Sequence, residues 1–145
     1  MKKNLRLVKV FSMGEVIKPN LYERLQVLDL KMFYGATNEF KTNREWWVIE
    51  DNNQIIAYCG SLYSEGVCIF IRAWVYKPYR GNGLQSKMIK ARLRAASGCY
   101  KAITYVYYDN SQSINNLIRN GFLTYNPQYQ YAGIVTGKQI GRAHI

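Results

Sequence analysis

The sequence predicts an α+β fold in which helices flank one mixed, mainly antiparallel sheet. Strand-like segments joined by short turns fill the middle of the chain, which is typical of antiparallel hairpins. The last of them, residues 67–75, leads into a glycine-containing turn and then a helix. Another strand pattern follows at residues 102–107, and a helical crossover of this kind joins parallel strands.

The first half of the chain contains a strand, a helix and a hairpin. Residues 5–11 have the β-branched and apolar content of a strand. Pro19 suits the first turn of a helix in which apolar residues recur every three or four positions, and the helix is expected to end at Gly35. Residues 45–50 and 54–61 flank an Asp-Asn-Asn turn and predict a hairpin.

Residues 67–75 form the central strand of the prediction. They are almost continuously apolar, which predicts burial on both faces in the middle of the sheet. Pro78 ends the ladder of strand hydrogen bonds. From Leu84 onward the apolar residues take helical spacing, and Gly98 is the expected C-cap of that helix.

The C-terminal part continues the alternation of strands and helices. Residues 111–120 are expected to form a short helix that Asn110 or Ser111 caps. Residues 121–125 and 130–135 predict the last two strands, and residues 137–145 are a basic tail with a weak pattern.

The turn Arg80-Gly81-Asn82-Gly83 before the central helix has the composition of a phosphate-binding loop. The first amides of a helix have no intrahelical partner, and two glycines let that backbone approach an anion closely. The alternative is a tight turn that only caps the helix. A Walker loop does not fit, because Leu84-Gln85 follows the last glycine, and a Rossmann fingerprint would need glycine at Ser86.

Length and composition predict one cytoplasmic domain of residues 1–145. No apolar run is long enough to span a membrane, and the first residues lack the apolar core of a signal peptide. Cys59, Cys68 and Cys99 lack metal-binding spacing, so buried reduced thiols are expected. His144 alone makes no metal site, and no metal is expected.

The net charge of +11 allows two interpretations. An acidic protein or RNA partner would suit so basic a chain, whereas a well-solvated surface would explain the charge without a partner. The basic residues are dispersed over the start, the central helix and the tail: Lys2, Lys3, Arg6 and Lys9, then Lys87, Lys90, Arg92 and Arg94, then Lys138 and Arg142.

Two stretches resemble signatures of the GNAT acetyltransferase superfamily. Residues 80–85 resemble its Arg/Gln-x-x-Gly-x-Gly/Ala motif, and residues 109–122 resemble its second signature, an asparagine before a helix that ends in Gly-Phe. The resemblance implies a splayed pair of parallel strands and acetyl-CoA as cofactor. It also implies that Trp74 and Val75 line the pantetheine and acetyl group, that Asn110 and Ser113 contact the cofactor, and that the pyrophosphate is held by Arg80, Gly81, Asn82, Gly83, Leu84, Gln85, Ser86 and Lys87.

The chain departs from the family pattern at three points. Gln85 replaces the last glycine or alanine of the motif. Leu117 stands where the family often has a general-acid tyrosine, and leucine cannot protonate a thiolate. The central strand carries Ile69 and Arg72 in the region where a catalytic glutamate is frequent.

The function expected from the sequence is acetyl-CoA-dependent N-acetylation of an amine by direct attack. Glu65 is the candidate base through a water, and Tyr107 or Tyr108 is the candidate acid. The more ordinary interpretations are a solvated loop glutamate and tyrosines that pack in a strand. The alternative function is a non-catalytic module that binds coenzyme A, or that holds nucleic acid or protein on its basic surface. The protein is expected to act as a monomer or homodimer.

Overall fold

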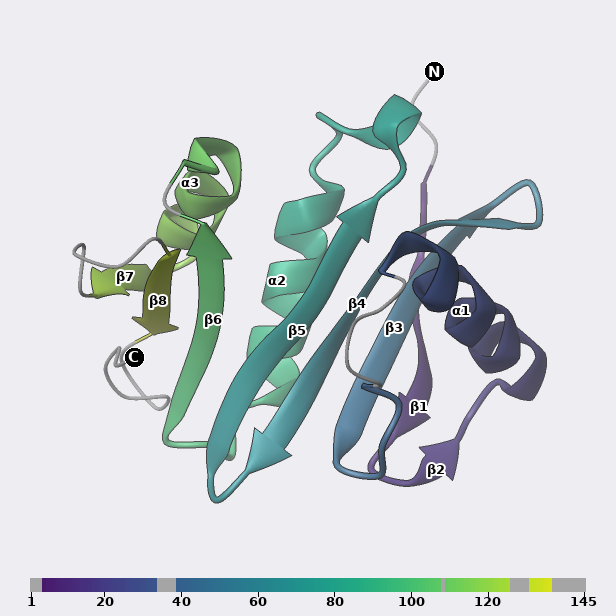
Figure 1. The fold of residues 1–145 in the computed structure, drawn as a ribbon, viewed down its shortest axis with the longest axis horizontal. Helices are drawn as coiled ribbons and strands as arrows, with labels where there is room; N and C mark the ends of the chain where they lie inside the picture. Colours follow the sequence, from purple (N-terminus) through teal and green to yellow (C-terminus); the bar gives the residue numbers. More distant parts are fainter. Residues whose placement is uncertain (1–3, 34–38, 108, 126–130, 137–145) are drawn as a thin grey trace.

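The computed structural model describes residues 4–33, 39–107, 109–125 and 131–136. Within them one sheet has the strand order β2-β1-β3-β4-β5-β6-β8-β7 (Figure 1). The strands are β1 Leu7–Ser12, β2 Glu15–Val16, β3 Arg44–Asp51, β4 Gln54–Ser64, β5 Val67–Val75, β6 Lys101–Tyr107, β7 Phe122–Tyr125 and β8 Tyr131–Thr136. The helices are α1 Pro19–Met32, α2 Leu84–Ala95 and α3 Ser111–Arg119. The predicted α+β class and the element order are confirmed. Helix α1 ends earlier than expected, at Met32 with Phe33 as its C-cap, while Gly35 itself and the basic tail lie outside the described residues.

Two tight turns build the antiparallel part of the sheet. Asn52 and Asn53, between β3 and β4, have φ of 52° and 62°, and Glu65 and Gly66, between β4 and β5, have φ of 50° and 79°. Positive φ at both central residues is the geometry of the two-residue hairpin loop whose twist matches that of the strands. The predicted hairpins are therefore confirmed.

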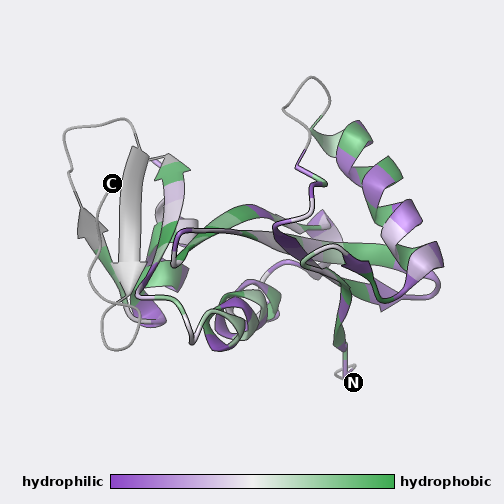
Figure 2. Ribbon diagram, turned by 90° about the horizontal axis from the view of Figure 1, so that it is seen from below, coloured by the Kyte–Doolittle hydropathy of each residue, from purple (hydrophilic) through white to green (hydrophobic). Residues whose placement is uncertain are grey.

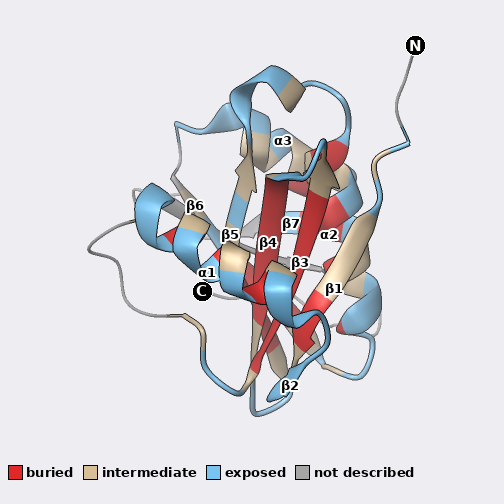
Figure 3. Cartoon of the chain, turned by 90° about the vertical axis from the view of Figure 1, so that its right-hand side faces the viewer, coloured by how far each residue is buried: buried red, intermediate tan, exposed pale blue. Residues whose placement is uncertain are grey.

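Helices α1 and α2 cover opposite faces of the sheet (Figure 2). Because side chains alternate along a strand, Trp46 and Val48 of β3 pack in the cluster that contains α1 residues, while Trp47 and Ile49 pack with α2 residues. Strands β3 and β4 are buried between the two layers (Figure 3). These two clusters cover β3 and β4, and another joins the first half of β5 to α2 and α3, which leaves the C-terminal end of β5 less covered.

Strands β5 and β6 are parallel, but they pair over only three residues. The last pair is Ile69 with Ile103, beyond which the strands diverge and β6 pairs with β8 on its other side (Figure 1). The prediction that β5 is buried on both faces is therefore wrong. Only Cys68 and Phe70 are buried along it, because the remainder of β5 has lost its neighbour on one side.

Helix α2 starts at Leu84 as predicted, but two expectations about it are wrong. Its C-cap is Ala96, with φ of −93°, because the chain turns before Gly98 without needing a left-handed residue. Arg92, which the sequence groups with the surface basic residues, is only 2% exposed. It lies on the face of α2 that packs against the sheet.

The cysteines agree with the prediction of reduced, sheltered thiols. Cys59 and Cys68 are buried and free, and Cys99 is half-buried. Burial raises the pKa of the Cys59 thiol to about 11 and that of Cys68 to about 12, so both stay protonated at neutral pH. No group of metal-ligating side chains occurs in the described residues, and none of the described helices could span a membrane.

Gly60→Ala tests the close packing of β4 against β3. A Cβ at Gly60 would lie 2.7 Å from the Trp46 ring, so either the backbone or the buried indole must move. We expect a loss of about 1–3 kcal/mol in the free energy of unfolding, measured by urea denaturation. Gly98→Ala is the control, because nothing lies within 4 Å of its added Cβ. Equal stability of the two variants would contradict this packing.

Candidate active site

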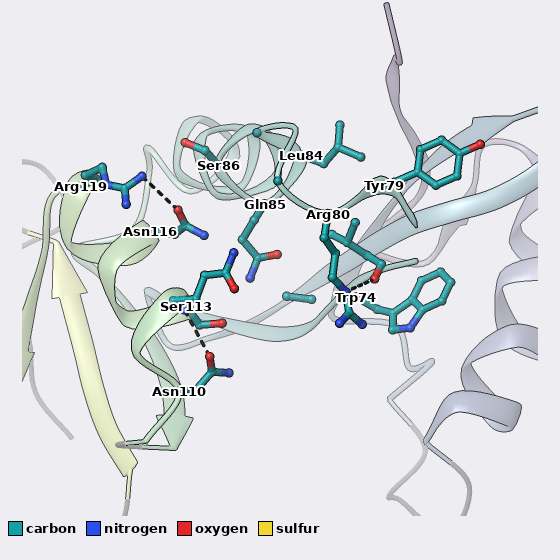
Figure 4. Close-up of a pocket in the computed structure, with 15 residues that line it drawn as sticks. Trp74, Tyr79, Arg80, Leu84, Gln85, Ser86, Asn110, Ser113, Asn116 and Arg119 are labelled. Carbon is teal, nitrogen blue, oxygen red and sulfur yellow. Dashed lines mark hydrogen bonds between the residues drawn. The ribbon is translucent and has the colours of Figure 1, made fainter. Parts of the chain in front are cut away.

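The candidate site is a cavity of ≈ 500 Å³ at the place where β5 and β6 have separated. Its walls come from three segments: the end of β5, the turn and first residues of α2, and one side of α3 (Figure 4). The sheet topology creates the opening, and α2 and α3 line it from either side. Both sequence signatures thus meet at one cavity.

The turn before α2 presents backbone to this cavity. Gly81 and Gly83 have φ of 81° and 78°, a left-handed conformation that glycine adopts without strain, and a Cβ at either position would meet nothing within 4 Å. Gly83 is the N-cap of α2 and has no side chain to bond the first helical amides. Those amides remain available, so the turn can accept an anion.

Arg80 and Arg119 make the cavity electropositive. Both line it, and none of the described acidic residues does. The Nε of Arg80 donates to the carbonyl of Val75 at 3.0 Å, which fixes the arginine at the end of β5. That bond uses one of its five N–H donors, and the others can reach a phosphate.

Helix α3 forms the opposite wall. The side chain of Asn110 caps the helix by accepting from the Ser113 amide at 3.3 Å, and both residues also line the cavity (Figure 4). The sequence missed Gln112, Asn116 and Arg119, which line the same wall. These three residues are spaced four and three positions apart along α3, so a search for one polar face of this helix could have found them.

Ten of the predicted cofactor-binding residues are brought together here. They are Trp74, Val75, Arg80, Gly81, Gly83, Leu84, Gln85, Ser86, Asn110 and Ser113. Ala73 and Tyr79 join them without having been predicted. Asn82 is not part of the lining, because its side chain bonds the Tyr79 carbonyl at 3.1 Å inside the turn. Lys87 is also absent, since its ammonium bonds the Leu5 carbonyl at 2.6 Å on another side of α2.

Of the three predicted catalytic residues, the structure places only the side chain of Glu65, and it lies away from the cavity. Glu65 lies in the β4–β5 turn, before the start of β5, whereas the cavity lies at the strand's C-terminal end. The length of β5 separates them by about 26 Å at 3.3 Å per residue, too far for a single water. Tyr107 ends β6, but its side chain and all of Tyr108 lie outside the described residues.

Two further side chains near the cavity, Leu117 and Tyr79, do not serve as proton donors to a ligand. Leu117 is 5% exposed and packs in the core cluster with Phe70 and Phe122. The hydroxyl of Tyr79 donates to Asp51 at 2.6 Å, and this bond raises the pKa of Tyr79. At neutral pH Tyr79 is therefore a poor proton donor for another group.

The separated parallel strands and the uncapped start of α2 thus border the same cavity. The family model of the GNAT acetyltransferases matches residues 11–122. The chain therefore belongs to the GNAT acetyltransferase family. None of the curated proteins compared with it gave a match.

Several solved structures share the fold of this chain. Escherichia coli ElaA is 13% identical, with 91% of this chain and 99% of that chain covered and a TM-score of 0.67. Arabidopsis thaliana NAA60, solved with a bisubstrate analogue, is 14% identical over 90% and 95%, with a TM-score of 0.65. The PaiA N-acetyltransferase of Thermoplasma acidophilum, solved with coenzyme A, is 11% identical over 82% and 70%, with a TM-score of 0.61. At these identities the likeness concerns the fold alone.

Gly83→Val tests whether the turn binds phosphate. A branched side chain would stand over the first amides of α2, and losing two charge-assisted hydrogen bonds would weaken coenzyme A binding about a hundredfold or more. Because φ at Gly83 is 78°, stability should also fall, by about 1–3 kcal/mol. Calorimetric titration of coenzyme A into the folded variant measures the affinity.

Gly14→Val is the matched control for backbone strain. Gly14 has φ of 91° and lies in the β1–β2 turn, so valine should cost similar stability there and leave the affinity for coenzyme A unchanged. Wild-type affinity in Gly83→Val would mean that the two glycines only shape a turn.

Proposed function

We propose that this protein is an acetyl-CoA-dependent N-acetyltransferase in which the amine acceptor attacks the thioester directly. The observation that carries the proposal is the continuity of the cavity. It joins a helix start with two open, left-handed glycines to the strand segment that has lost its neighbour. A long ligand with phosphates at one end and amides at the other fits both halves.

The phosphate half of the cofactor would bind at the start of α2. The amides of Leu84, Gln85 and Ser86, together with Arg80, would hold the pyrophosphate. Asn110 and Ser113 would contact the cofactor from α3. Lys87 and Asn82 have no part in this proposal, because both side chains are engaged elsewhere.

The pantetheine half would use the free edge of β5. The amide of Tyr76 donates to Ile56 of β4 at 2.7 Å, and successive amides of a strand point to opposite sides. The N–H groups of Val75 and Ala73 therefore face away from β4, toward the gap. Unpaired backbone groups need partners, and the pantetheine amides and the thioester carbonyl can supply them.

The transfer needs only positioning and polarisation. The neutral amine nitrogen attacks the thioester carbonyl carbon, the C–N bond forms and the C–S bond breaks. The coenzyme A thiolate leaves, and the nitrogen releases its extra proton to solvent. A strand amide at Val75 stabilises the negative charge that develops on the carbonyl oxygen. No proton has to pass through Glu65.

The acceptor would approach from the α1 side of Trp74. That residue lines the cofactor cavity and also a second cavity of ≈ 380 Å³. The second cavity is lined mainly by apolar and aromatic side chains, together with Asn53 and Gln54, and among the described residues its charged lining is Arg24 and Lys31. Arg24 is paired with Glu50, which leaves Lys31 as its charge. We infer an amine with an apolar or aromatic body and no second positive charge, since the unpaired cation of the lining repels polyamines.

One observation favours a second candidate function, the holding of an acidic partner. A shallow groove between β1 and α2 is lined by Arg6, Lys9, Lys87 and Arg94 and by none of the described acidic residues, although Lys9 is paired with Glu45. Such a groove attracts anionic chains without any chemistry. A non-catalytic protein that binds coenzyme A and an acidic partner would have the same two surfaces.

Acetyl-CoA should raise the melting temperature, because it binds only the folded cavity. A concentration of 100 times Kd would contribute about 2.7 kcal/mol of stability. Pantetheine without phosphates should give little shift, since the helix start would have nothing to hold. An unchanged melting temperature at saturating acetyl-CoA would contradict the cofactor assignment.

The reaction itself is tested by incubating the protein with acetyl-CoA and separate pools of aromatic monoamines, polyamines, peptides and RNA. Mass detection of acetylated product in the monoamine or peptide pool is the expected result. Binding of acetyl-CoA with no acetylated product in any pool would favour the non-catalytic function.

A further inference from the structure

Strand β5 contains a bulge next to the segment that lines the cavity. In the β4–β5 pairing, Cys59 is opposite Ala73 while Gly60 is opposite Ile71, so Arg72 is an extra residue on β5. Its φ is 54°, a left-handed conformation that a residue with a side chain rarely adopts. Such a conformation persists only where surrounding contacts hold it, and Arg72 has contacts on both faces of the sheet.

On the α1 face the side chain of Arg72 is held by a buried carboxylate. Its Nε donates to Asp29 at 2.8 Å, and Asp29 is 6% exposed. The guanidinium also lies 4.4 Å from the ring centre of Phe33. The hydroxyl of Tyr58 donates to the same Asp29 oxygen at 2.7 Å, which fixes the carboxylate from the sheet.

On the α2 face the backbone of the bulge is held by a buried cation. One terminal nitrogen of Arg92 donates to the carbonyls of Arg72 and Gly60, both at 3.3 Å, and its Nε donates to Met88 at 3.2 Å. Its guanidinium lies 4.0 Å from the ring centre of Phe70. No salt bridge joins Arg92 to a described carboxylate.

Burying an arginine without a carboxylate is costly. Burial lowers the pKa of the Arg92 guanidinium, as it does for any cation taken out of water. An apolar side chain would fill this part of the core at lower cost. What arginine adds is a rigid fork of donors that reaches both strands at the bulge.

The contact with the Arg72 carbonyl also orients the next amide. A trans peptide is planar, so the carbonyl of Arg72 and the N–H of Ala73 point in opposite directions as one rigid unit. The N–H of Ala73 faces the gap between β5 and β6, as does that of Val75. Fixing the bulge therefore fixes the donors nearest to the thioester in the proposed reaction.

We propose that Arg92 and the Asp29–Arg72 ion pair are positioning residues that hold the bulge of β5 and aim its amides at the thioester carbonyl. The clamp acts through the backbone and touches neither cofactor nor acceptor. This proposal rests on the proposed function. It identifies the residues that hold the backbone donor rigid in a site where no side chain has been assigned as the catalyst. Cofactor affinity should not depend on the clamp, because the phosphates bind at the start of α2.

The infrared band of the thioester carbonyl measures this polarisation without any acceptor. Acetyl-CoA with carbon-13 at that carbonyl should absorb at lower frequency when bound to the wild-type protein than when free, because a hydrogen bond weakens the C=O bond. In Arg92→Met most of this shift should be lost and the band should broaden. The Kd for acetyl-CoA should stay within about threefold of wild type, since the two sites are separate. Arg94→Met, an exposed change on the same helix, should leave the band and Kd unchanged.

A second variant keeps the test decisive if Arg92→Met does not fold. The double change Asp29→Asn with Arg72→Gly removes the ion pair without leaving a buried charge, and glycine suits the left-handed φ. It should also reduce the carbonyl shift with little effect on Kd. A wild-type band in either folded variant would overturn the clamp. Failure of the wild-type protein to bind acetyl-CoA would instead overturn the proposed function.

Discussion

The short pairing of β5 with β6 is the constraint on which the rest of this structure depends. Three residue pairs hold the two strands together, and beyond Ile69 and Ile103 each strand follows a different neighbour. The backbone of β5 is thereby left with an open edge inside the protein, which is costly unless a ligand or water satisfies it. The cavity, its polar walls and the proposed use of pantetheine amides all follow from that opening.

Local chemistry made much of the fold predictable. The glycine turn, the start of α2 at Leu84 and the two hairpins depend on short-range preferences that each residue carries by itself. The same holds for Asn110 as the cap of α3. These elements also place ten of the predicted cofactor residues around one cavity, because both signatures flank the diverging strands.

The errors concern features that only the tertiary structure decides. A run of apolar residues looks buried on both faces, but whether a partner strand accompanies it to its end depends on the route of β6 and β8. In the sequence Arg92 resembles the other basic residues of a solvated helix face. In the structure it is buried and donates to the carbonyls of Gly60 and Arg72 at the bulge. Glu65 is a candidate base through a water in the sequence, yet the whole length of β5 separates it from the cavity.

The central claim is that one ligand spans the helix start and the open edge of β5. The most direct test is an amide NMR titration of the nitrogen-15-labelled protein with acetyl-CoA. The account predicts that the amides of Gly81, Gly83 and Leu84 shift together with those of Ala73 and Val75, all with one affinity. Shifts confined to the basic groove at Arg6 and Arg94, or the absence of shifts at the β5 edge, would contradict it.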